Sequence, residues 1–377
     1  RRLCGQTVNA ELKDKFAMSV RAPIGVVGII TPWNFPIAIA TWKSFPAIIA
    51  GNAVIWKPAT ETPLMATELG KIFEEAGLPK GIINIVYGAG GEVGDAMVQH
   101  KDIHVISFTG SNETGSHIAS ECGRQLKKVS LELGGKNAVI VMDDADLDLA
   151  VEGIIWSAFG TSGQRCTACS RVIVHENVKE ALEERLLAKM NKLTIGNGLE
   201  KDVKVGPIIN QAGLEKIASY IEIGKEEGAT LLAGGHRLTE APYNKGYYFA
   251  PTLFTNVTSE MRIAQEEIFG PVVSFIPVAS FEEAITVNNS VAYGLSSAIF
   301  TNDVNRVFQA QRDLDTGIVY INAGTTGAEI HLPFGGTKGT GNGHRDSGVQ
   351  ALDVFTEWKA IYVDYSGKLQ RAQIDVD

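Results

Sequence analysis

The sequence predicts an α/β protein built on parallel, doubly wound sheets. Apolar runs of strand length alternate with segments of helical pattern, and glycine or proline marks most of the short connections between them. The run Ile24–Thr31 is apolar without interruption, which is typical of a strand covered on both faces. Strand–helix alternation with short connections favours parallel pairing with helices on both sides of the sheet. The length of 377 residues favours two domains.

The first half of the chain supplies most of this pattern. Residues 11–23 are extended and partly alternating, which predicts an edge hairpin. An apolar helix is expected up to about Ala50, and Thr62-Pro63 is expected to begin the next one, because proline suits the first turn. The strands of this half are expected at residues 24–31, 52–56, 82–87, 104–108 and 128–133.

The second half repeats the alternation. Ser280 and Glu283 form a capping box that begins a helix ending at Asn289. Residues 323–348 are rich in glycine and predict a long functional loop, whereas the apolar run 358–363 predicts a strand that pairs with another subunit. Strands are expected at 137–142, 171–175, 230–234, 247–254, 295–301 and 317–322, and helices at 146–160, 179–193, 211–227 and between the last two strands.

Composition excludes several classes of function. Apolar residues make up 45% and charged residues 20%, as in globular proteins. The net charge of -9, without a basic block, argues against nucleic acid or an anionic membrane as partner. No apolar run is long enough to span a bilayer, and the start has no signal-peptide shape. Four cysteines are too few for a disulfide framework, which predicts a reducing, cytoplasmic compartment.

Polar residues follow the carboxyl ends of the strands in the first half. They are Asn34, Lys57, Gly90, Ser111 and Glu132. In open α/β sheets ligands bind outside the carboxyl ends of the strands. The sequence therefore predicts that these five residues lie at one edge of the sheet and form a ligand site.

Taken singly, each of these residues has two interpretations. The glycine cluster 88–94 is placed to bind a cofactor phosphate, or it is a tight turn, and it lacks the spaced dinucleotide fingerprint. Lys57 binds a ribose or phosphate, or it is solvated. Asn34 donates to an oxyanion, or it forms a turn. Glu132 is a desolvated general base with a raised pKa, or it is a paired structural carboxylate.

The stretch 163–168 places Cys166 next to Arg165. A thiolate is the reactive form of cysteine, and a cationic neighbour makes it easier to form. Cys166 and Cys169 have the spacing of a redox pair or of half a zinc site. The sequence has no second Cys pair and no suitably spaced histidines, so no metal site is predicted. The other interpretation is that Cys169 is a small buried residue beside the reactive one.

Seven ordered motifs give a more specific result. Together they resemble the aldehyde dehydrogenase superfamily, and the resemblance covers essentially the whole chain. The motifs are Thr31-Pro32-Trp33-Asn34-Phe35-Pro36, Trp56-Lys57-Pro58-Ala59, Phe108-Thr109-Gly110-Ser111, Leu131-Glu132-Leu133-Gly134-Gly135-Lys136-Asn137, Gly163-Gln164-Arg165-Cys166-Thr167, Glu266-Glu267-Ile268-Phe269-Gly270-Pro271 and Pro333-Phe334-Gly335-Gly336.

The resemblance implies a domain organisation. It implies part of an oligomerisation arm at 1–22, a Rossmann-like cofactor domain at 23–134, an α/β catalytic domain at 135–345, and a C-terminal segment with an oligomerisation strand at 346–377. It also implies a homodimer or homotetramer. The chain does not begin with Met, and further residues of the cofactor domain are expected before Arg1.

The resemblance also implies catalytic roles. Cys166 matches the nucleophile that adds to an aldehyde carbonyl and forms a thiohemiacetal. Asn34, with the Cys166 backbone N–H, matches the donors to the resulting oxyanion, and loss of such a donor typically costs about 100- to 1000-fold in rate. Glu132 matches the base that activates water to hydrolyse the later thioester. Its presence argues against a relative that transfers the acyl group to coenzyme A.

The implied cofactor is NAD or NADP. Lys57 matches the ligand of the adenosine ribose, Ser111 and Gly90 match the pyrophosphate cradle, and Glu267 and Phe269 match the nicotinamide end. Many members that prefer NAD have a glutamate at the position of Thr60, whereas here Glu61 follows one step later, which leaves NAD and NADP both open. Further residues expected along the same channel are Thr31, Pro32, Trp33, Gly94, Thr109, Gly110 and Leu133.

The substrate expectation rests on Arg165, because arginine binds carboxylates in a bidentate way. Its alternative role is a structural salt bridge. Trp42 and Thr167 are expected to line the same site. The runs 321–329 and 341–345 resemble the branch that acts on carboxylated semialdehydes, such as aminoadipate semialdehyde and 2-oxoglutarate semialdehyde. The alternatives are a cysteine esterase without a redox step, an aldehyde dehydrogenase for neutral aldehydes, and a catalytically silent structural relative.

Overall fold

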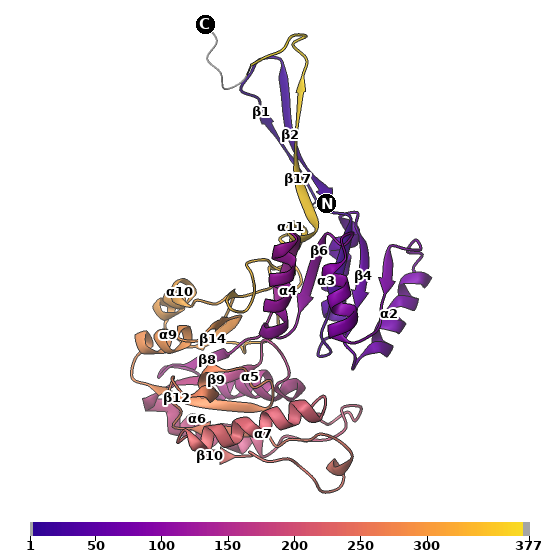
Figure 1. Ribbon diagram of the computed structural model, residues 1–377. Coiled ribbons are helices and arrows are strands. Elements are labelled where there is room, and N and C mark those ends of the chain that lie inside the picture. Colours follow the sequence, from indigo (N-terminus) through magenta and orange to yellow (C-terminus); the bar gives the residue numbers. More distant parts are fainter. Residues whose placement is uncertain (1–2, 372–377) are drawn as a thin grey trace.

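The computed structural model describes residues 3–371 and contains two large sheets and a long β arm. Figure 1 shows the five-stranded sheet beside the seven-stranded sheet, with the three-stranded arm projecting away from both. The predicted α/β class with parallel sheets is confirmed.

The five-stranded sheet is entirely parallel, in the order β5-β4-β3-β6-β7. Its central strand β3 buries Ile29 against α1 and α2, and Ile30 against the helices on the opposite face. This explains why the strand is apolar at every position. The elements are β3 (Val26–Ile30), α1 (Ala38–Ile49), β4 (Ala53–Lys57), α2 (Pro63–Glu75), β5 (Ile83–Ile85), α3 (Asp95–Gln99), β6 (Val105–Thr109), α4 (Asn112–Arg124) and β7 (Lys128–Glu132).

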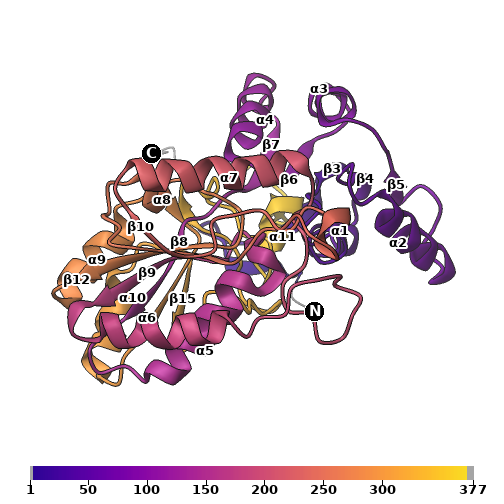
Figure 2. The same cartoon turned by 90° about the horizontal axis from the view of Figure 1, so that it is seen from below.

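The seven-stranded sheet has the order β10-β11-β12-β9-β8-β14-β15 and is parallel except at its edge strand β10. Helix α7 covers one face, and α5 and α6 cover the other (Figure 2). The elements are β8 (Asn137–Val141), α5 (Leu147–Phe159), β9 (Cys169–His175), α6 (Glu176–Met190), α7 (Gln211–Glu226), β10 (Thr230–Ala233), β11 (Thr252–Thr255), α8 (Arg262–Gln265), β12 (Val272–Val278), α9 (Phe281–Asn289), β14 (Ser296–Phe300), α10 (Val304–Asp313) and β15 (Ile318–Ile321).

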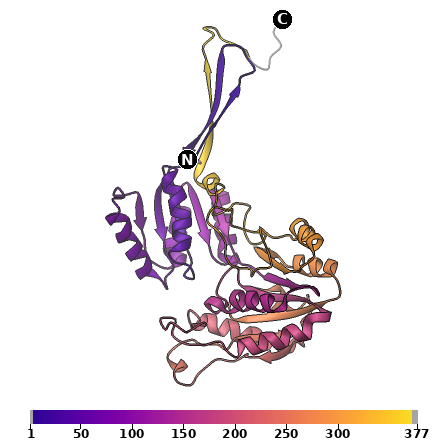
Figure 3. The ribbon, with the colours of Figure 1, turned by 180° about the vertical axis from the view of Figure 1, so that it is seen from behind.

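The arm joins the two ends of the chain (Figure 3). β17 (Thr356–Asp364) pairs antiparallel with β2 (Lys15–Pro23), and β1 (Gln6–Asn9) forms the other edge. Trp358 and Tyr362 on β17 are 53% and 67% exposed. The short helix α11 (Ala351–Phe355) joins β17 to the body, where Val354 and Phe355 pack into the core of the five-stranded sheet.

The structure differs from the sequence predictions in three elements and adds one strand. The strand β12 was not predicted. The first strand of the N-terminal hairpin lies at 6–9, and residues 11–14 only form its turn. Helix α6 begins at Glu176 rather than 179, because the His175 side chain caps it by accepting from the Asn177 N–H at 3.3 Å. Strand β11 begins at Thr252 rather than 247.

The loop 323–348 is irregular, as predicted, apart from the short strand β16 (Thr337–Lys338), which pairs with β13 (Tyr293–Gly294). Within the described range, 3–371, no helix has both the length and the apolar character needed to cross a membrane.

Candidate active site

Two cavities meet at Cys166. One has a volume of about 230 Å³ and the other about 280 Å³, and both are lined by Ile39, Thr109, Leu133 and Cys166. The five-stranded sheet contributes residues from the carboxyl ends of its strands, such as Thr109 and Glu132. The seven-stranded sheet contributes loops that precede its strands, with Cys166 before β9 and Phe269 before β12. The site therefore lies between the two sheets.

A strained turn holds Cys166 in this position. Helix α5 ends at Phe159, and Thr161 and Ser162 then adopt positive φ angles of 57° and 56°. Gly163 has φ of 70°, and a Cβ there would collide with the carbonyl of Gly270, so only glycine fits. Strain of this kind is typical of functional sites. The turn is thus packed against the segment that carries Phe269.

Burial has the largest influence on the pKa of the Cys166 thiol. Burial, followed by the Glu132 and Glu267 carboxylates, raises the pKa of this thiol to about 12, although the backbone N–H groups of Thr167 and Cys166 act in the opposite direction. Burial lowers the pKa of the Arg165 guanidinium, and the Cys166 thiolate acts in the opposite direction. The lowering of the thiol pKa that was expected from the cationic neighbour therefore does not prevail over burial.

Glu132 faces the first cavity as a buried carboxylate. Its side chain is 3% exposed, and neither oxygen has a hydrogen-bond partner among the described residues. Burial and then Asp346 raise its pKa well above the usual value, whereas Lys43 and Arg345 lower it. Within the described residues Glu132 is therefore not a paired structural carboxylate, and this alternative is wrong.

Behind Glu132 lies a buried ion pair that the sequence analysis missed. Lys43 Nζ donates to Asp346 Oδ2 at 2.7 Å and to Ser107 Oγ at 2.9 Å. Lys43 occupies the buried stripe of α1 with Ala40 and Ala47. A lysine in the apolar stripe of a helix was the available signal. Its partner Asp346 lies 303 residues further along the chain, and no local pattern marks it.

Asn34 lines the second cavity next to Cys166. Its Nδ2 donates one hydrogen bond to the Gln164 carbonyl at 3.0 Å, and its Oδ1 is buried without a partner among the described residues. An amide nitrogen has two N–H donors, so one remains for a group that enters the cavity.

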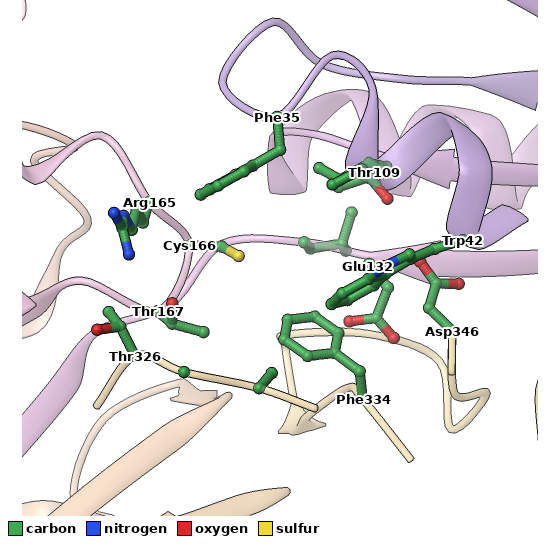
Figure 4. A pocket seen from close by; sticks show the side chains of 15 residues that line it. Phe35, Trp42, Thr109, Glu132, Arg165, Cys166, Thr167, Thr326, Phe334 and Asp346 are labelled. Atoms are coloured by element: carbon green, nitrogen blue, oxygen red, sulfur yellow. The ribbon is translucent and has the colours of Figure 1, made fainter. Parts of the chain in front are cut away.

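The first cavity has apolar walls and one cationic side (Figure 4). Trp42 and Phe334 meet edge to face at 5.3 Å. The Arg165 guanidinium lies 5.5 Å from the Phe35 ring and 5.2 Å from the Trp156 ring, and its Nε donates to Thr161 Oγ1 at 2.7 Å. Arg165 forms no ion pair within residues 3–371, which contradicts its salt-bridge alternative. The terminal nitrogens of the Arg165 guanidinium therefore remain available to a group in the cavity.

The second cavity contains the other carboxylate. Glu267 Oε1 accepts from the Gly135 N–H at 2.9 Å, and burial raises the pKa of Glu267. Phe269 has a positive φ of 61° and contacts Trp33 edge to face at 5.7 Å. The second cavity thus combines an aromatic wall with a buried acceptor, a combination that suits a ring joined to a sugar diol. The predicted residues Pro32, Trp33, Asn34, Thr109, Gly110, Ser111, Leu133, Cys166, Glu267 and Phe269 all line this cavity.

The remaining predicted residues lie further along the sheet edge. Gly90 and Gly94 line a third cavity of about 380 Å³, and a Cβ at Gly90 would meet nothing within 4 Å. Lys57 is buried, and within the described residues its Nζ donates only to the Pro58 carbonyl, at 3.0 Å. Thr31 accepts from Trp56 Nε1 at 2.9 Å, and Thr60 is exposed. Thr31, Lys57 and Thr60 line none of these three cavities. Arg165, Trp42 and Thr167 line the first one.

Cys169 does not share the cavities. It is buried in the core beside α5 and α6, and its thiol contacts the Arg171 carbonyl at 3.4 Å. Across residues 3–371, no cluster of three or more His, Cys, Asp and Glu side chains is arranged to hold a metal ion.

The fold and the site define a class. The family model described as the aldehyde dehydrogenase family matches residues 1–361, and the chain belongs to this family. The resemblance inferred from the seven motifs is thereby confirmed.

Curated relatives and a solved structure agree with this assignment. The chain is 47% identical over 362 residues to an α-ketoglutaric semialdehyde dehydrogenase of Bacillus subtilis, covering 96% of this chain and 74% of the relative. It is 40% identical over 364 residues to a 2,5-dioxopentanoate dehydrogenase of Saccharolobus solfataricus, covering 96% and 75%. A betaine aldehyde dehydrogenase of Staphylococcus aureus, crystallised with NAD+, is 38% identical with a TM-score of 0.94, covering 97% of this chain and 72% of that one.

Proposed function

We propose that this protein oxidises an aldehyde to a carboxylate with NAD or NADP. The observation that carries the proposal is the place of Cys166 between two cavities, with Glu132 facing one and Glu267 facing the other. A hydrolytic aldehyde dehydrogenase needs a nucleophile that meets the substrate from one side and the cofactor from the other. It also needs a base near the resulting adduct.

Each step is assigned to a residue of this chain. The Cys166 thiolate adds to the aldehyde carbonyl, and the free N–H of Asn34 with the Cys166 backbone N–H stabilises the oxyanion. Bound NAD(P) supplies the hydride acceptor that allows this adduct to become a thioester. Glu132, kept without a protein partner, then removes a proton from the water that attacks the thioester. Cys166 leaves as a thiolate and is regenerated.

We assign the cofactor to the second cavity and to the sheet edge beyond it. Glu267 would hold the nicotinamide ribose, Phe269 would pack beside the ring, and Ser111, Gly90 and Lys57 would hold the remaining length of the molecule. These residues fit it, because Glu267 is a buried acceptor and Lys57 is a buried cation with a single partner. Burial lowers the pKa of Lys57, and the Glu61 carboxylate acts in the opposite direction. Glu61 therefore lies near Lys57, which favours NAD because a carboxylate there repels a 2'-phosphate.

We propose a small carboxylated semialdehyde as the substrate. The apolar walls suit a short carbon chain, and the free fork of Arg165 suits its far carboxylate. The hydroxyl of Thr326 is buried in the same wall without a partner among the described residues, and it adds a second polar group. Figure 4 shows Arg165 and Glu132 on opposite sides of the Cys166 sulfur. The names of two curated relatives agree with this class of substrate.

Replacing Arg165 by leucine is expected to raise KM for acidic semialdehydes by about 10- to 100-fold, the range of a lost charge-assisted bidentate contact. KM for neutral aldehydes should change much less, because they offer the guanidinium no counter-charge. Arg165→Lys is the matched control and should lie between the two, since lysine retains the charge but not the fork. Steady-state kinetics measure all three. Equal changes for acidic and neutral substrates would contradict the assignment.

The absorbance of reduced nicotinamide tests the proposed function as a whole. Mixing the protein with a panel of semialdehydes and neutral aldehydes, with NAD and separately with NADP, should give reduced cofactor, fastest with acidic semialdehydes and NAD. Ester hydrolysis without any cofactor reduction across the panel would favour the cysteine esterase instead.

The pH dependence of turnover tests the electrostatics of Glu132. Because its pKa is raised, Glu132 becomes a base only above the usual glutamate range, so turnover should rise with pH through this pKa. Asp346 raises and Lys43 lowers this pKa. Asp346→Asn should therefore shift the inflection to lower pH and Lys43→Met to higher pH, each on the order of one pH unit. Shifts in the same direction would contradict this account.

We also propose the division into segments 1–22, 23–134, 135–345 and 346–377, and an arm that assembles a homodimer or homotetramer. The separate sheets on either side of residue 134 and the exposed aromatic residues of β17 support it. Residues 1–2 and 372–377 of the outer segments lie outside the described residues. Light scattering with and without Trp358→Ser tests the assembly. The cytoplasmic compartment stays a prediction.

A further inference from the structure

Trp156 is an exposed aromatic side chain on the last turn of helix α5. It is 59% exposed and lines neither of the two cavities that meet at Cys166. Its ring nevertheless lies 5.2 Å from the guanidinium of Arg165, the residue that we assign to the substrate's carboxylate.

The Arg165 side chain is held by two rings and one hydroxyl. Its guanidinium lies 5.2 Å from the Trp156 ring and 5.5 Å from the Phe35 ring, which is within the range of cation–π attraction. Its Nε donates to Thr161 Oγ1 at 2.7 Å. The Trp156 ring also lies beside Gly160, where a Cβ would be 3.5 Å from the ring's Cε3. One ring and the hydroxyl thus come from the end of α5 and from the turn that follows it.

These contacts occupy one part of the guanidinium and leave another part free. The group has five N–H donors, one on Nε and four on the two terminal nitrogens. The Nε donor is bound to Thr161, and the terminal nitrogens donate to no group within residues 3–371. Arginine binds a carboxylate through two parallel N–H donors. With Nε engaged, the pair that remains for a carboxylate in the first cavity is the terminal one.

We infer that Trp156 and Thr161 are positioning residues for substrate specificity, which hold the Arg165 guanidinium so that its two terminal nitrogens bind the far carboxylate of an acidic aldehyde. This inference rests on the proposed function, because it takes Arg165 as the site of that carboxylate. Neither Trp156 nor Thr161 lines the first cavity, so both act through Arg165 and do not touch the substrate.

The physical reason is that a long side chain loses rotamer freedom when it binds a ligand. Arg165 is half-buried, and the two rings and the hydroxyl restrict its side chain before any substrate arrives. Less freedom is then lost on binding, and the affinity for a carboxylate is higher. A neutral aldehyde does not use the guanidinium, so it gains much less from this restriction.

Steady-state kinetics with glutarate semialdehyde and pentanal test the inference, because both chains have the same length and only the first carries a carboxylate. Trp156→Leu should raise KM for glutarate semialdehyde by about three- to tenfold, the range of one cation–π contact, with kcat nearly unchanged. KM for pentanal should change much less. Trp156→Phe keeps a ring and should restore most of the affinity. Thr161→Val removes the hydroxyl but keeps the shape, and it should have the same selective effect as Trp156→Leu.

Two controls separate this role from a merely structural one. Leu149→Ala removes another exposed apolar side chain from α5 and should leave KM for both aldehydes unchanged. In an Arg165→Leu background, Trp156→Leu should have little further effect on either aldehyde, because the residue through which it acts is gone.

The opposing outcomes are distinct. Equal rises in KM for the two aldehydes, a fall in kcat in place of a rise in KM, or an undiminished effect in the Arg165→Leu background would overturn the inference and leave the proposed function standing. Thr161→Val decides the matter if Trp156→Leu does not fold. A wild type that reduces neither NAD nor NADP with any aldehyde would overturn the proposed function and this inference with it.

Discussion

Replacing Cys166 by alanine is expected to lower the rate of aldehyde oxidation by more than about 1000-fold. The reason is that the covalent route through a thiohemiacetal and a thioester disappears with the sulfur. Cys166 is the one cysteine of the described chain that lines the two cavities facing Glu132 and Glu267. The loss should appear in kcat, measured as reduced nicotinamide formed at saturating aldehyde and cofactor.

Cys169→Ala is the matched control for this experiment. Cys169 is three positions away but lies in the core beside α5, with its thiol turned to the Arg171 carbonyl. We expect its replacement to lower stability modestly, through a small cavity, and to leave the rate within a few-fold of the wild type. Two variants that lose activity equally would instead favour the dithiol interpretation of this sequence.

Replacing Glu132 by glutamine should separate the two halves of the reaction. The first turnover should still release about one equivalent of reduced cofactor per Cys166, because acylation does not need the water-activating base. Steady-state turnover should then fall by more than about 100-fold, since the thioester has no base to hydrolyse it. Rapid mixing followed by absorbance gives both quantities.

Glu68→Gln on the exposed face of α2 is the control for the loss of one carboxylate, and it should retain both phases. If Glu132→Gln abolished the burst as well, Glu132 would act before or during acylation. Its role as the base for the water would then be wrong.

The first half of the site was predictable from local pattern. Each apolar strand ends at a polar residue, so Asn34, Ser111 and Glu132 could be placed at one sheet edge before any contact was known. The contribution of the second sheet was not predictable in this way. Cys166 and Phe269 precede their strands, and only the packing of the two sheets brings them to the carboxyl ends of the first.

Two further features depend on contacts distant in sequence. The Lys43–Asp346 pair, which sets the charge around Glu132, joins α1 to the glycine-rich loop. The sequence left Arg165 with a salt bridge or a substrate carboxylate as its partner. To choose between them, one must know the contacts of the Arg165 side chain. They are two aromatic rings and a hydroxyl, and Arg165 forms no ion pair among the described residues.

The absence of β12 from the predicted strands does not depend on distant contacts. Its sequence, Val272–Val278, is a buried apolar run of strand length and was recognisable as such. Pro277 near its end is the signal against a central strand. It occupies an exposed position close to the carboxyl end of β12, where the ladder tolerates it.

The mass of the Glu132→Gln protein after one turnover tests the central claim most directly. The variant is mixed with a small acidic semialdehyde and NAD, quenched in acid, and analysed by mass spectrometry of the intact chain and of its peptides. The account predicts one acyl group per chain, located on Cys166 and equal in amount to the burst of reduced cofactor. Reduced cofactor without an acyl group on Cys166, or an acyl group on another residue, would contradict it.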